Sequence, residues 1–501
     1  MAPIRSSTLI ALLGFCRLAC AAPTLASLSS VASLSSAVSS GVAASSSIVS
    51  TSSLELSASF SAAEPSATVS FASTNPNFPM WGPDSPPSVP EPERGSLGAS
   101  IMGPSNPPLE LQNPAMLAPP TTDNGEVGNP KWSFSLSPNR IQTGGWARQQ
   151  NVKVMPIAEN LAAVDMRLEA GAIRELHWHD TSEWAYVLKG TAQVTSIDTE
   201  GRNFRGNVGP GDLWFFPAGL PHSLQATNED PDGCEFLLIF PDGNFSEDDT
   251  FLLTDWLAHV PAEVIQKNFQ LNSSKPFSHI PAKPLYIFPW TQASAAPNTA
   301  EPVSDPNGQV PQSFTYAFSN VTATPLAGGS VKVVDSRTFP VSTTISAAEV
   351  TVEPNALREL HWHPTMDEWG FILEGQARIT VFASQSNAKT FNYQAGDIAY
   401  IPASFDDTYT NPGHYVENTG NTTLKFLEIF NTSEILSRSN FVSLINAFPD
   451  IYQDVSLTQW LAVTPPELLK AHLDLDDETI AHLNKTKATV VAPLIVDGHA
   501  M

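Results

Sequence analysis

A short phrase occurs twice in this 501-residue chain, and both copies place residues that can bind a metal at nearly the same spacing. Residues 174–184 read Arg-Glu-Leu-His-Trp-His-Asp-Thr-Ser-Glu-Trp, and residues 358–369 read Arg-Glu-Leu-His-Trp-His-Pro-Thr-Met-Asp-Glu-Trp. Side chains at positions i and i+2 of a β-strand point to the same face, so the two histidines of each copy can converge on one ion. The repeat therefore predicts two metal sites, with the candidate ligands His177, His179 and Glu183, and His361, His363 and Glu368.

A further histidine follows each copy. In the first half of the chain, His222 comes five residues after Pro217. In the second half, His414 comes twelve residues after Pro402, and removing residues 406–412 restores the spacing of five. His414 is the only histidine in that stretch, so we interpret it as the counterpart of His222, displaced by an insertion.

The segments that position these residues have the pattern of β-strands. Runs such as residues 163–168 and 377–382 alternate with period two, and Gly-Asp and Pro-x-Gly turns separate such runs. Helical patterns occur only near Trp256 and Trp460, with Thr254 as a candidate cap for the first helix. We predict an all-β fold of two antiparallel barrels in tandem, each followed by short helices.

The N-terminal part of the chain has the pattern of a secretory signal. Arg5 precedes an apolar run over residues 8–15, which is too short to span a bilayer, and Ala19-Cys20-Ala21 forms a small-residue cleavage site. We therefore expect a secreted, extracellular glycoprotein with Asn-x-Ser/Thr sequons at Asn244, Asn272, Asn320, Asn421, Asn431 and Asn484. The predicted organisation is a signal peptide (1–21), a Ser/Pro-rich disordered stalk and linker (22–130), and two barrel domains (131–290 and 313–485).

Charge and cysteine content exclude several classes of function. The net charge of −25 argues against binding to nucleic acid or to an anionic membrane, and we expect no membrane partner. An anionic substrate would need local positive charge. Once the signal is removed, Cys234 is the single cysteine, which excludes both a disulfide within the chain and a zinc site built on thiolates.

Two motifs carry a resemblance to a known family. The pattern G-x5-H-x-H-x3,4-E-x6-G runs from Gly171 to Gly190, and G-x5-P-x-G-x2-H-x3-N runs from Gly211 to Ala226, where Ala replaces the usual Asn. The chain resembles the cupins and, because the unit is doubled, the bicupins. It is most similar to the secreted fungal oxalate decarboxylases, over residues 130–480. The resemblance implies that the barrels are of the jelly-roll type.

The resemblance also implies an activity and the residues that carry it. The family converts oxalate to formate and CO2 with one Mn2+ in each barrel and O2 as a co-catalyst, and His222 and His414 would complete the two ligand sets. Residues 246–250 correspond to the family's mobile lid, in which Glu247 matches the acid that handles protons. Glu428, in the run Phe-Leu-Glu-Ile-Phe, matches the acid candidate of the second barrel. Within the lid, an aspartate replaces the common asparagine.

This chemistry explains why an arginine and a proton donor belong beside the metal. Direct loss of CO2 from oxalate would leave a carbanion without an electron sink, whereas reversible removal of one electron gives a radical that loses CO2 easily. A glutamate then supplies the proton. Arg174 and Arg358 precede the histidine pairs by three residues and are the candidates for binding a substrate carboxylate. Without a placed donor, the radical goes on to CO2 and peroxide.

Alternatives remain open from the sequence. An oxalate oxidase would release peroxide instead of formate, and a storage-type bicupin would have no activity, although such proteins usually lose the ligands that are present here. Bicupins of this type commonly assemble as trimers or hexamers, so we expect a homo-oligomer.

A second apparent insertion covers residues 433–449. Both insertions are either retained intron sequence or genuine loop extensions, and the sequence of the cDNA decides between them.

Overall fold

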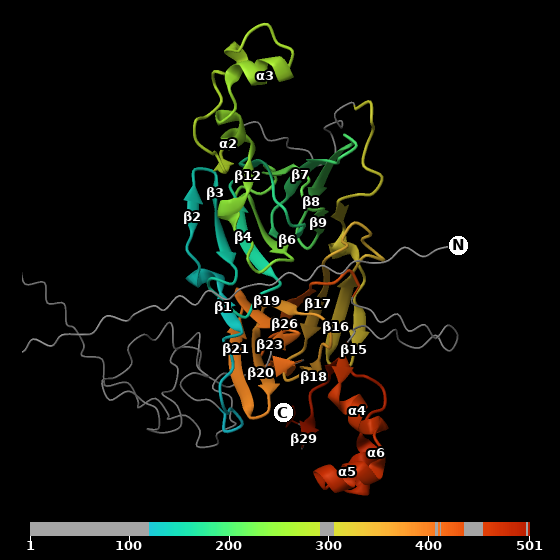
Figure 1. Ribbon diagram of the computed structural model, residues 1–501. Helices are drawn as coiled ribbons and strands as arrows, with labels where there is room; N and C mark the ends of the chain where they lie inside the picture. Colours follow the sequence, from blue (N-terminus) through green and yellow to red (C-terminus); the bar gives the residue numbers. More distant parts are fainter. Residues whose placement is uncertain are drawn as a thin grey trace, which may run out of the picture. The chain divides into compact units, whose positions relative to one another are not determined.

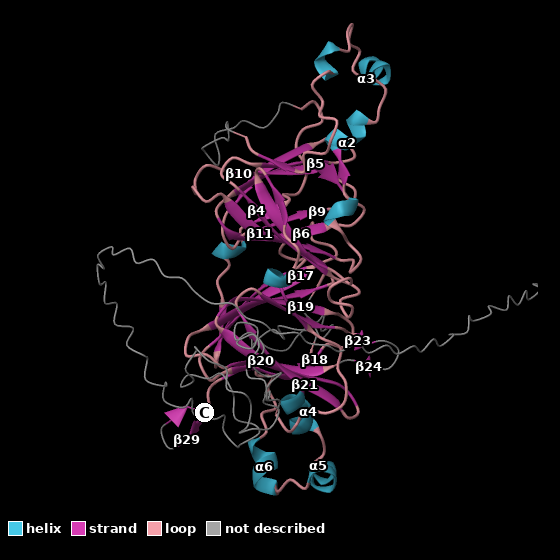
Figure 2. Cartoon of the chain, turned by 90° about the vertical axis from the view of Figure 1, so that its left-hand side faces the viewer, coloured by secondary structure: helices cyan, strands magenta, loops and turns pink. Residues whose placement is uncertain are grey.

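The computed structural model describes residues 120–290, 305–405, 409–410, 412–434, 454–496 and 499–500. The predicted signal peptide, nearly all of the predicted stalk and most of the two predicted insertions lie outside these ranges. Within them, strands dominate and form two barrels, as Figures 1 and 2 show. No helix in these ranges is long and apolar enough to cross a membrane.

The first barrel consists of two antiparallel sheets. Its strands are short because turn residues interrupt the alternating pattern every few positions. One sheet contains, in spatial order, β14 (Thr315–Tyr316), β9 (Leu213–Phe216), β6 (Glu183–Lys189), β11 (Cys234–Phe240), β4 (Ala162–Leu168), β3 (Gly145–Gln150) and β2 (Arg140–Gln142). The other contains β12 (Phe251–Leu252), β5 (Ile173–Trp178), β10 (His222–Ala226), β7 (Ala192–Ile197) and β8 (Asn203–Val208), with β13 (Ile287–Phe288) also paired to β5.

The second barrel repeats this order. One sheet contains β1 (Lys131–Ser133), β22 (Asp397–Ile401), β19 (Glu368–Glu374), β26 (Leu424–Phe430), β17 (Ser346–Val352), β16 (Gly329–Val334) and β15 (Thr324–Leu326). The other contains β21 (Asn387–Gln394), β20 (Gln376–Ser384), β25 (Gly413–Asn418), β18 (Leu357–Trp362) and β27 (Val455–Ser456), with β28 (Val490–Val491) also paired to β18. Two separate hairpins pair β23 (Ser404–Phe405) with β24 (Tyr409–Thr410), and β29 (Ile495–Val496) with β30 (His499–Ala500). The predicted all-β fold of two jelly-roll-type barrels is confirmed.

The two barrels exchange edge strands. β1 belongs to the first predicted domain (131–290) but pairs with β22 of the second barrel. β14 belongs to the second predicted domain (313–485) but pairs with β9 of the first barrel. Apolar side chains continue across the contact, where the rings of Phe134 and Phe371 lie 6.0 Å apart. The indole Nε1 of Trp369 in the second barrel donates to Gln150 Oε1 of the first at 2.8 Å. The core of the first barrel therefore extends into the second barrel, which also has a separate core cluster of its own.

Short helices follow each barrel, as predicted. They are α2 (Leu253–Ala258) and α3 (Ala262–Asn268) after the first, and α4 (Leu457–Val463), α5 (Pro466–Leu473) and α6 (Asp477–His482) after the second. Four 3-10 turns complete the described elements: η2 (Phe134–Leu136), η3 (Glu247–Asp249), η4 (Lys275–Phe277) and η5 (Phe318–Asn320).

The predicted cap of the first helix was wrong. α2 begins at Leu253, so Thr254 lies inside the helix and not before it. Glu175 Oε1 instead accepts hydrogen bonds from the backbone N–H of Thr254 at 3.1 Å and from its hydroxyl at 2.8 Å, so this buried carboxylate satisfies a free N–H of the first turn. The corresponding helix α4 does have a side-chain cap, since Ser456 accepts a hydrogen bond from the backbone of Gln459.

Candidate metal centres

The first cluster of metal-binding residues lies inside the first barrel, between its two sheets. His177 belongs to β5, His179 follows that strand directly, Glu183 begins β6 and His222 begins β10. All four side chains are buried, and one ligand atom from each lies within 4.8 Å of the others. The register of β5 and β10 places His222 directly opposite His177. The fold thus brings together the four residues that the sequence suggested.

Backbone carbonyl groups orient the three imidazole rings. The Nδ1 atoms of His177, His179 and His222 each lie 2.7–2.8 Å from the carbonyl oxygen of a residue two positions away in the chain. Because a carbonyl oxygen only accepts, Nδ1 carries the proton and Nε2 keeps its lone pair. The Nε2 atom of His222 has no hydrogen-bond partner among the described residues. A buried lone pair without a partner fits a metal ligand.

The electrostatics of the cluster favour the ligand forms of these groups. Burial, followed by the charge of Arg174, lowers the pKa of His177 well below 6.5, so its ring is neutral. Burial by itself raises the pKa of Glu183, but the neighbouring His222 and His179 lower it to well below the usual range. A metal ion binds neutral imidazole and ionised carboxylate. The exception is His179: burial lowers its pKa, but the hydrogen bond with Glu183 and the charge of Glu183 outweigh burial and raise it above 6.5, so an ion competes with a proton for this ring.

Trp214 positions the carboxylate of Glu183. Its indole Nε1 donates to Glu183 Oε1 at 2.7 Å, while Oε2 of the same carboxylate lies 3.3 Å from His179 Nε2. A hydrogen bond to the outer oxygen fixes the orientation of a ligating carboxylate. This contact gives Trp214 of β9 a role beyond filling the barrel.

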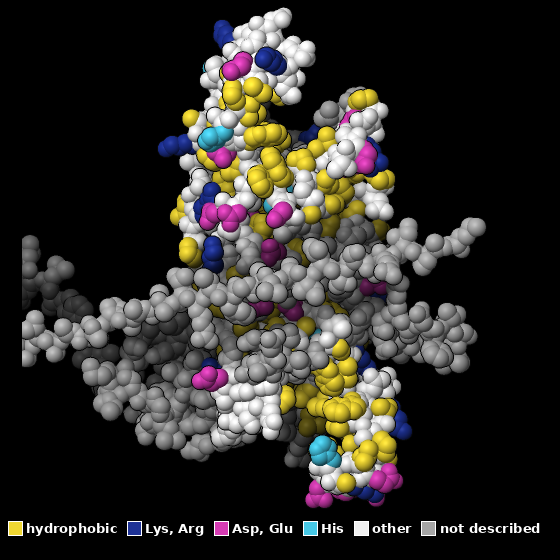
Figure 3. All heavy atoms as spheres, viewed as in Figure 1, with side chains coloured by type: hydrophobic (Ala, Val, Ile, Leu, Met, Phe, Trp, Pro, Cys, Tyr) yellow, Lys and Arg dark blue, Asp and Glu magenta, His cyan; other side chains and the backbone are white. Residues whose placement is uncertain are grey.

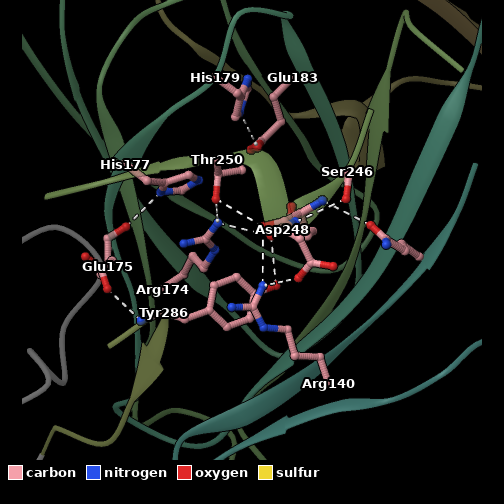
Figure 4. A network of polar contacts seen from close by, with 12 residues as sticks. Arg140, Arg174, Glu175, His177, His179, Glu183, Ser246, Asp248, Thr250 and Tyr286 are labelled. Atoms are coloured by element: carbon pink, nitrogen blue, oxygen red, sulfur yellow. Dashed lines mark hydrogen bonds and ion pairs between the residues drawn. The ribbon is translucent and has the colours of Figure 1, made fainter. Parts of the chain in front are cut away.

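Arg174 and Glu247 form a buried ion pair beside this cluster, and Figure 4 shows Arg174 next to Thr250 and Tyr286. Nη2 of Arg174 lies 3.0 Å from Glu247 Oε2 and also donates to Thr250 Oγ1 at 3.3 Å. The hydroxyl of Tyr286 donates to the same Oε2 at 2.8 Å. Burial, followed by the charge of Glu247, raises the pKa of Tyr286 well above 10, so the phenol keeps its proton. Glu247 itself lies in η3, within the lid segment of residues 246–250.

A β-bulge brings each arginine to its cluster. Three residues separate Arg174 from His177, and in a regular strand this odd spacing would put the two side chains on opposite faces. The partners of Arg174 and His177 on β10 are Leu224 and His222, which are only two residues apart, so β5 contains one extra residue. The same irregularity occurs between β18 and β25.

The second cluster repeats the arrangement in the second barrel. His361, His363, Glu368 and His414 are buried, with ligand atoms within 4.8 Å of one another. His414 lies opposite His361, as His222 lies opposite His177, so the predicted insertion leaves the strand register intact. Burial, followed by the charge of Arg358, lowers the pKa of His361 well below 6.5, and burial lowers that of His363 to about 4.

The arginine of the second cluster contacts two carboxylates. Nε of Arg358 lies 3.3 Å from Glu428 Oε1, and its Nη2 lies 2.5 Å from Asp454 Oδ2. Asp454 is also paired with Lys487. Glu428 occupies in β26 the position that Leu238 occupies in β11. The two predicted acids, Glu247 and Glu428, therefore approach their arginines from different elements of the fold.

The cupin family model matches residues 134–276 and 319–480, one stretch in each barrel. Oxalate decarboxylase OxdC of Bacillus subtilis (strain 168) is 49% identical over 405 residues, which cover 80% of this chain and 97% of that protein. A probable oxalate decarboxylase of Arthroderma benhamiae is 36% identical over 407 residues, which cover 80% and 92%. The chain belongs to the oxalate decarboxylases of the cupin family.

Solved structures agree with this membership. The structure of the Bacillus subtilis oxalate decarboxylase at pH 4.6 matches this cupin with a TM-score of 0.71 and 49% sequence identity, over 81% of this chain and 98% of that one. Another structure of the same bacterial protein, also 49% identical, accompanies an assignment of the EPR parameters of its Mn(II) centres. The bicupin architecture expected from the two motifs is thus shown.

Three polar residues of this cupin were missed by the sequence analysis. Glu175 is buried, and its carboxylate accepts hydrogen bonds from the backbone of Thr254, Leu285 and Tyr286, which fixes the segments around the first cluster. A glutamate stands at this place in both copies of the repeated phrase, Glu175 and Glu359, and this repetition could have identified it as a candidate. Tyr286 and Asp454 have no comparable signal, because the fold brings them from distant positions.

Proposed function

We propose that this chain converts oxalate to formate and CO2 at the cluster of the first barrel. The overall change is hydrogen oxalate to formate plus CO2, so one C–C bond breaks and one C–H bond forms. The observation that carries the proposal is the buried Arg174–Glu247 pair beside the His177 cluster. It places a group that binds carboxylates next to a group that can deliver a proton, with both shielded from water.

We infer that Mn2+ is the ion in both clusters and that O2 is a co-catalyst. Three imidazoles and one carboxylate leave two positions free on an octahedral ion, which suits a redox-capable metal with room for a small ligand. The Mn(II) centres of the bacterial relative support this choice. Together, Mn2+ and O2 would supply a reversible one-electron oxidation of the substrate.

The side chains beside the first cluster bind the substrate and transfer the proton. The guanidinium of Arg174 binds one substrate carboxylate and stabilises the charge that develops there. Only Nη2 of Arg174 contacts Glu247 in this structure, and Nε and Nη1 have no hydrogen-bond partner among the described residues, so the substrate carboxylate binds these two atoms and competes with Glu247 for the guanidinium. The carboxylate of Glu247 first takes the proton of hydrogen oxalate. After CO2 has left, Glu247 gives this proton to the remaining carbon, which yields formate and restores the carboxylate. Tyr286 and Thr250 hold the acid and the arginine in place.

Product analysis tests this proposal. Protein expressed with added manganese is supplied with oxalate and O2 at mildly acidic pH, and formate, CO2 and peroxide are measured together. We expect one formate for each oxalate consumed and very little peroxide. Stoichiometric peroxide with little formate would establish an oxalate oxidase instead. A protein that binds manganese and consumes no oxalate would favour a storage-type bicupin without activity.

We propose further that the chain forms a homo-oligomer, a trimer or a hexamer. Large apolar side chains are exposed on the helical segments of both barrels, and Figure 3 shows them gathered over α2 and α4. They include Trp256 at 58% exposure and Trp460 at 54%. Such clustered apolar surface marks a protein interface. Light scattering coupled to gel filtration gives the mass, and a monomer at micromolar concentration would contradict the proposal.

Secretion and glycosylation also stand as proposals. The signal pattern of residues 1–21 supports secretion. Among the sequon asparagines, Asn244, Asn272, Asn320, Asn421 and Asn484 are exposed, so a glycan could be attached without disturbing the core. Mass spectrometry of protein recovered from the culture medium would show the processed N-terminus and the glycan-bearing peptides. Recovery of the full-length chain inside the cells alone would argue against both.

A further inference from the structure

Two arginines lie on the ring of Tyr286, and each contacts a different part of the lid segment (residues 246–250). The guanidinium carbon of Arg174 lies 4.2 Å from the ring centroid, and that of Arg140 lies 3.6 Å from it. Figure 4 shows both arginines next to the tyrosine. At these distances a guanidinium is attracted to an aromatic ring. Tyr286 thus helps to fix both cations.

The two arginines differ in what they bind. Arg174 is fully buried and pairs with the carboxylate of Glu247. Arg140, on β2, donates from Nη1 to Asp248 Oδ1 at 2.9 Å and to the backbone oxygen of Glu247 at 3.3 Å. Arg140 also borders a cavity of about 450 Å³ between the β2–β3 hairpin and the lid segment. Arg174 therefore contacts the reacting end of the acid, whereas Arg140 contacts the backbone that carries it.

Substrate binding affects these two contacts differently. Under the proposed function, a substrate carboxylate bound to Nε and Nη1 of Arg174 competes with Glu247 for the guanidinium, so the inner contact is weakened during each turnover. The exposed pair between Arg140 and Asp248 does not involve Arg174 and is retained. The neutral bond from the backbone N–H of Glu247 to Gln149 Oε1, at 3.0 Å, is also retained.

We propose that Arg140 is a positioning residue that keeps the lid segment closed through Asp248 while Arg174 is occupied by substrate. By holding the backbone of Glu247, Arg140 returns the proton donor to the carbon after CO2 has left. It thereby favours formate over peroxide. This role rests on the proposed function for its chemical consequence, but the closure of the segment can be measured independently.

The strength of the contact suits a segment that must also open. The side chain of Arg140 is 33% exposed and that of Asp248 is 68% exposed, so water and salt weaken their ion pair. A weak pair shifts the balance between open and closed states severalfold without locking it. An asparagine at position 248 would keep a hydrogen-bond acceptor but lose the charge.

The test compares Asp248→Asn and Arg140→Gln with the unchanged, manganese-loaded protein. The first readout is hydrogen–deuterium exchange at the amides of residues 246–250 without substrate. The second is the ratio of peroxide to formate during turnover. A matched control is Asp232→Asn, which removes an exposed ion pair with Lys189 in the same barrel, away from the lid segment.

We expect both variants to raise amide exchange in the segment severalfold and to raise the peroxide-to-formate ratio severalfold, with Asp232→Asn unchanged in both. The double variant should not exceed Arg140→Gln, because Asp248 acts through Arg140, whereas Arg140 also contacts the backbone oxygen of Glu247. Unchanged exchange and product ratio in Asp248→Asn, whose exposed site tolerates the change, would overturn the proposal. If the wild-type protein made no formate, the exchange result would still decide whether Arg140 closes the segment.

Discussion

The carboxylate of Glu247 and the guanidinium of Arg174 form an ion pair of 3.0 Å with almost no exposure to solvent, at 5% and 0% of their side-chain surfaces. Neither residue is near the other in sequence, and neither is a metal ligand. Taking two charges out of water is costly unless they are paired, and here Nη2 of Arg174 pairs with Glu247 while its Nε and Nη1 have no hydrogen-bond partner among the described residues. The barrel thus holds the acid beside donor atoms that can bind a substrate carboxylate.

Replacing Glu247 by Gln should reduce formate production at least about 100-fold, because the amide cannot donate a carboxylic proton to the carbon. Peroxide should rise relative to formate. Parallel assays of both products with Asp249→Asn, which makes the same change at an exposed neighbour in η3, provide the control. Formate production that survives in Glu247→Gln would remove Glu247 from the role of donor and direct attention to Glu428.

Removing one histidine from a cluster should remove one metal ion. We expect His179→Ala and His363→Ala each to bind one Mn2+ per chain where the unchanged protein binds two, one for each cluster. The ion is lost because two imidazoles and a carboxylate bind it far less tightly than the three imidazoles and the carboxylate of the complete cluster. Elemental analysis after dialysis measures this, with the exposed His259→Ala as the control. Two ions per chain in either cluster variant would contradict the ligand assignment.

The two arginines should differ in their effect on catalysis. Arg174→Lys should lower kcat/KM for oxalate about 100-fold, because a lysine loses the fork that binds a carboxylate and its developing charge. Arg358→Lys should lower it much less, since Glu428 and Asp454 already contact that guanidinium. Steady-state kinetics at equal metal content tests the difference. A larger loss in Arg358→Lys would assign turnover to the second barrel.

The contribution of Asp165 to the stability of the protein should fall as the pH rises from about 4 to about 8, opposite to the contributions of His177, His361 and His363, whose lowered pKa values make stability rise toward pH 6.5. Burial, followed by the charge of Glu235, raises the pKa of Asp165 from 3.8 to about 8, against the opposing effect of Arg148. Between these two values the folded chain binds a proton that the unfolded chain releases, so stability decreases with pH, by up to about 1.4 kcal/mol per pH unit. Thermal unfolding of Asp165→Asn and of the unchanged protein across this range measures the contribution as a difference, and the variant should gain stability relative to the unchanged protein as the pH rises. A difference in melting temperature that does not change with pH would exclude Asp165 as its cause.

Replacing Gln150 by Leu should destabilise the contact between the barrels. Gln150 and Trp369 are completely buried, and the substitution leaves the indole Nε1 without its acceptor. An unsatisfied buried donor costs about 1–3 kcal/mol. Denaturant unfolding of Gln150→Leu should show this loss, and the double variant with Trp369→Phe should recover part of it. A stability equal to that of the unchanged protein would show that the bond contributes nothing.

The repeated phrase, the alternating runs and the spacing of the later histidines, together with the family resemblance, predicted the fold class and the members of both clusters. Alternation with period two is a property of adjacent residues, so strands such as β4 and β20 could be predicted from local sequence. The i and i+2 spacing and the matched distances in the two halves likewise depend on the order of residues along the chain. For this reason even His414, displaced by an apparent insertion, could be placed opposite His361.

Other features were decided by the tertiary structure. The spacing of three residues between Arg174 and His177 predicts opposite faces, and only the bulge in β5 brings both to the cluster. Tyr286 reaches the first site through the pairing of β13 with β5, and the exchange of β1 and β14 between barrels depends on which sheet edge is open. Such contacts join residues far apart in the chain, and packing, not local periodicity, determines them. The sequence by itself therefore determined the metal ligands and the two-barrel fold, whereas only the packed structure decided how the arginine, the acid and the tyrosine meet beside the ion.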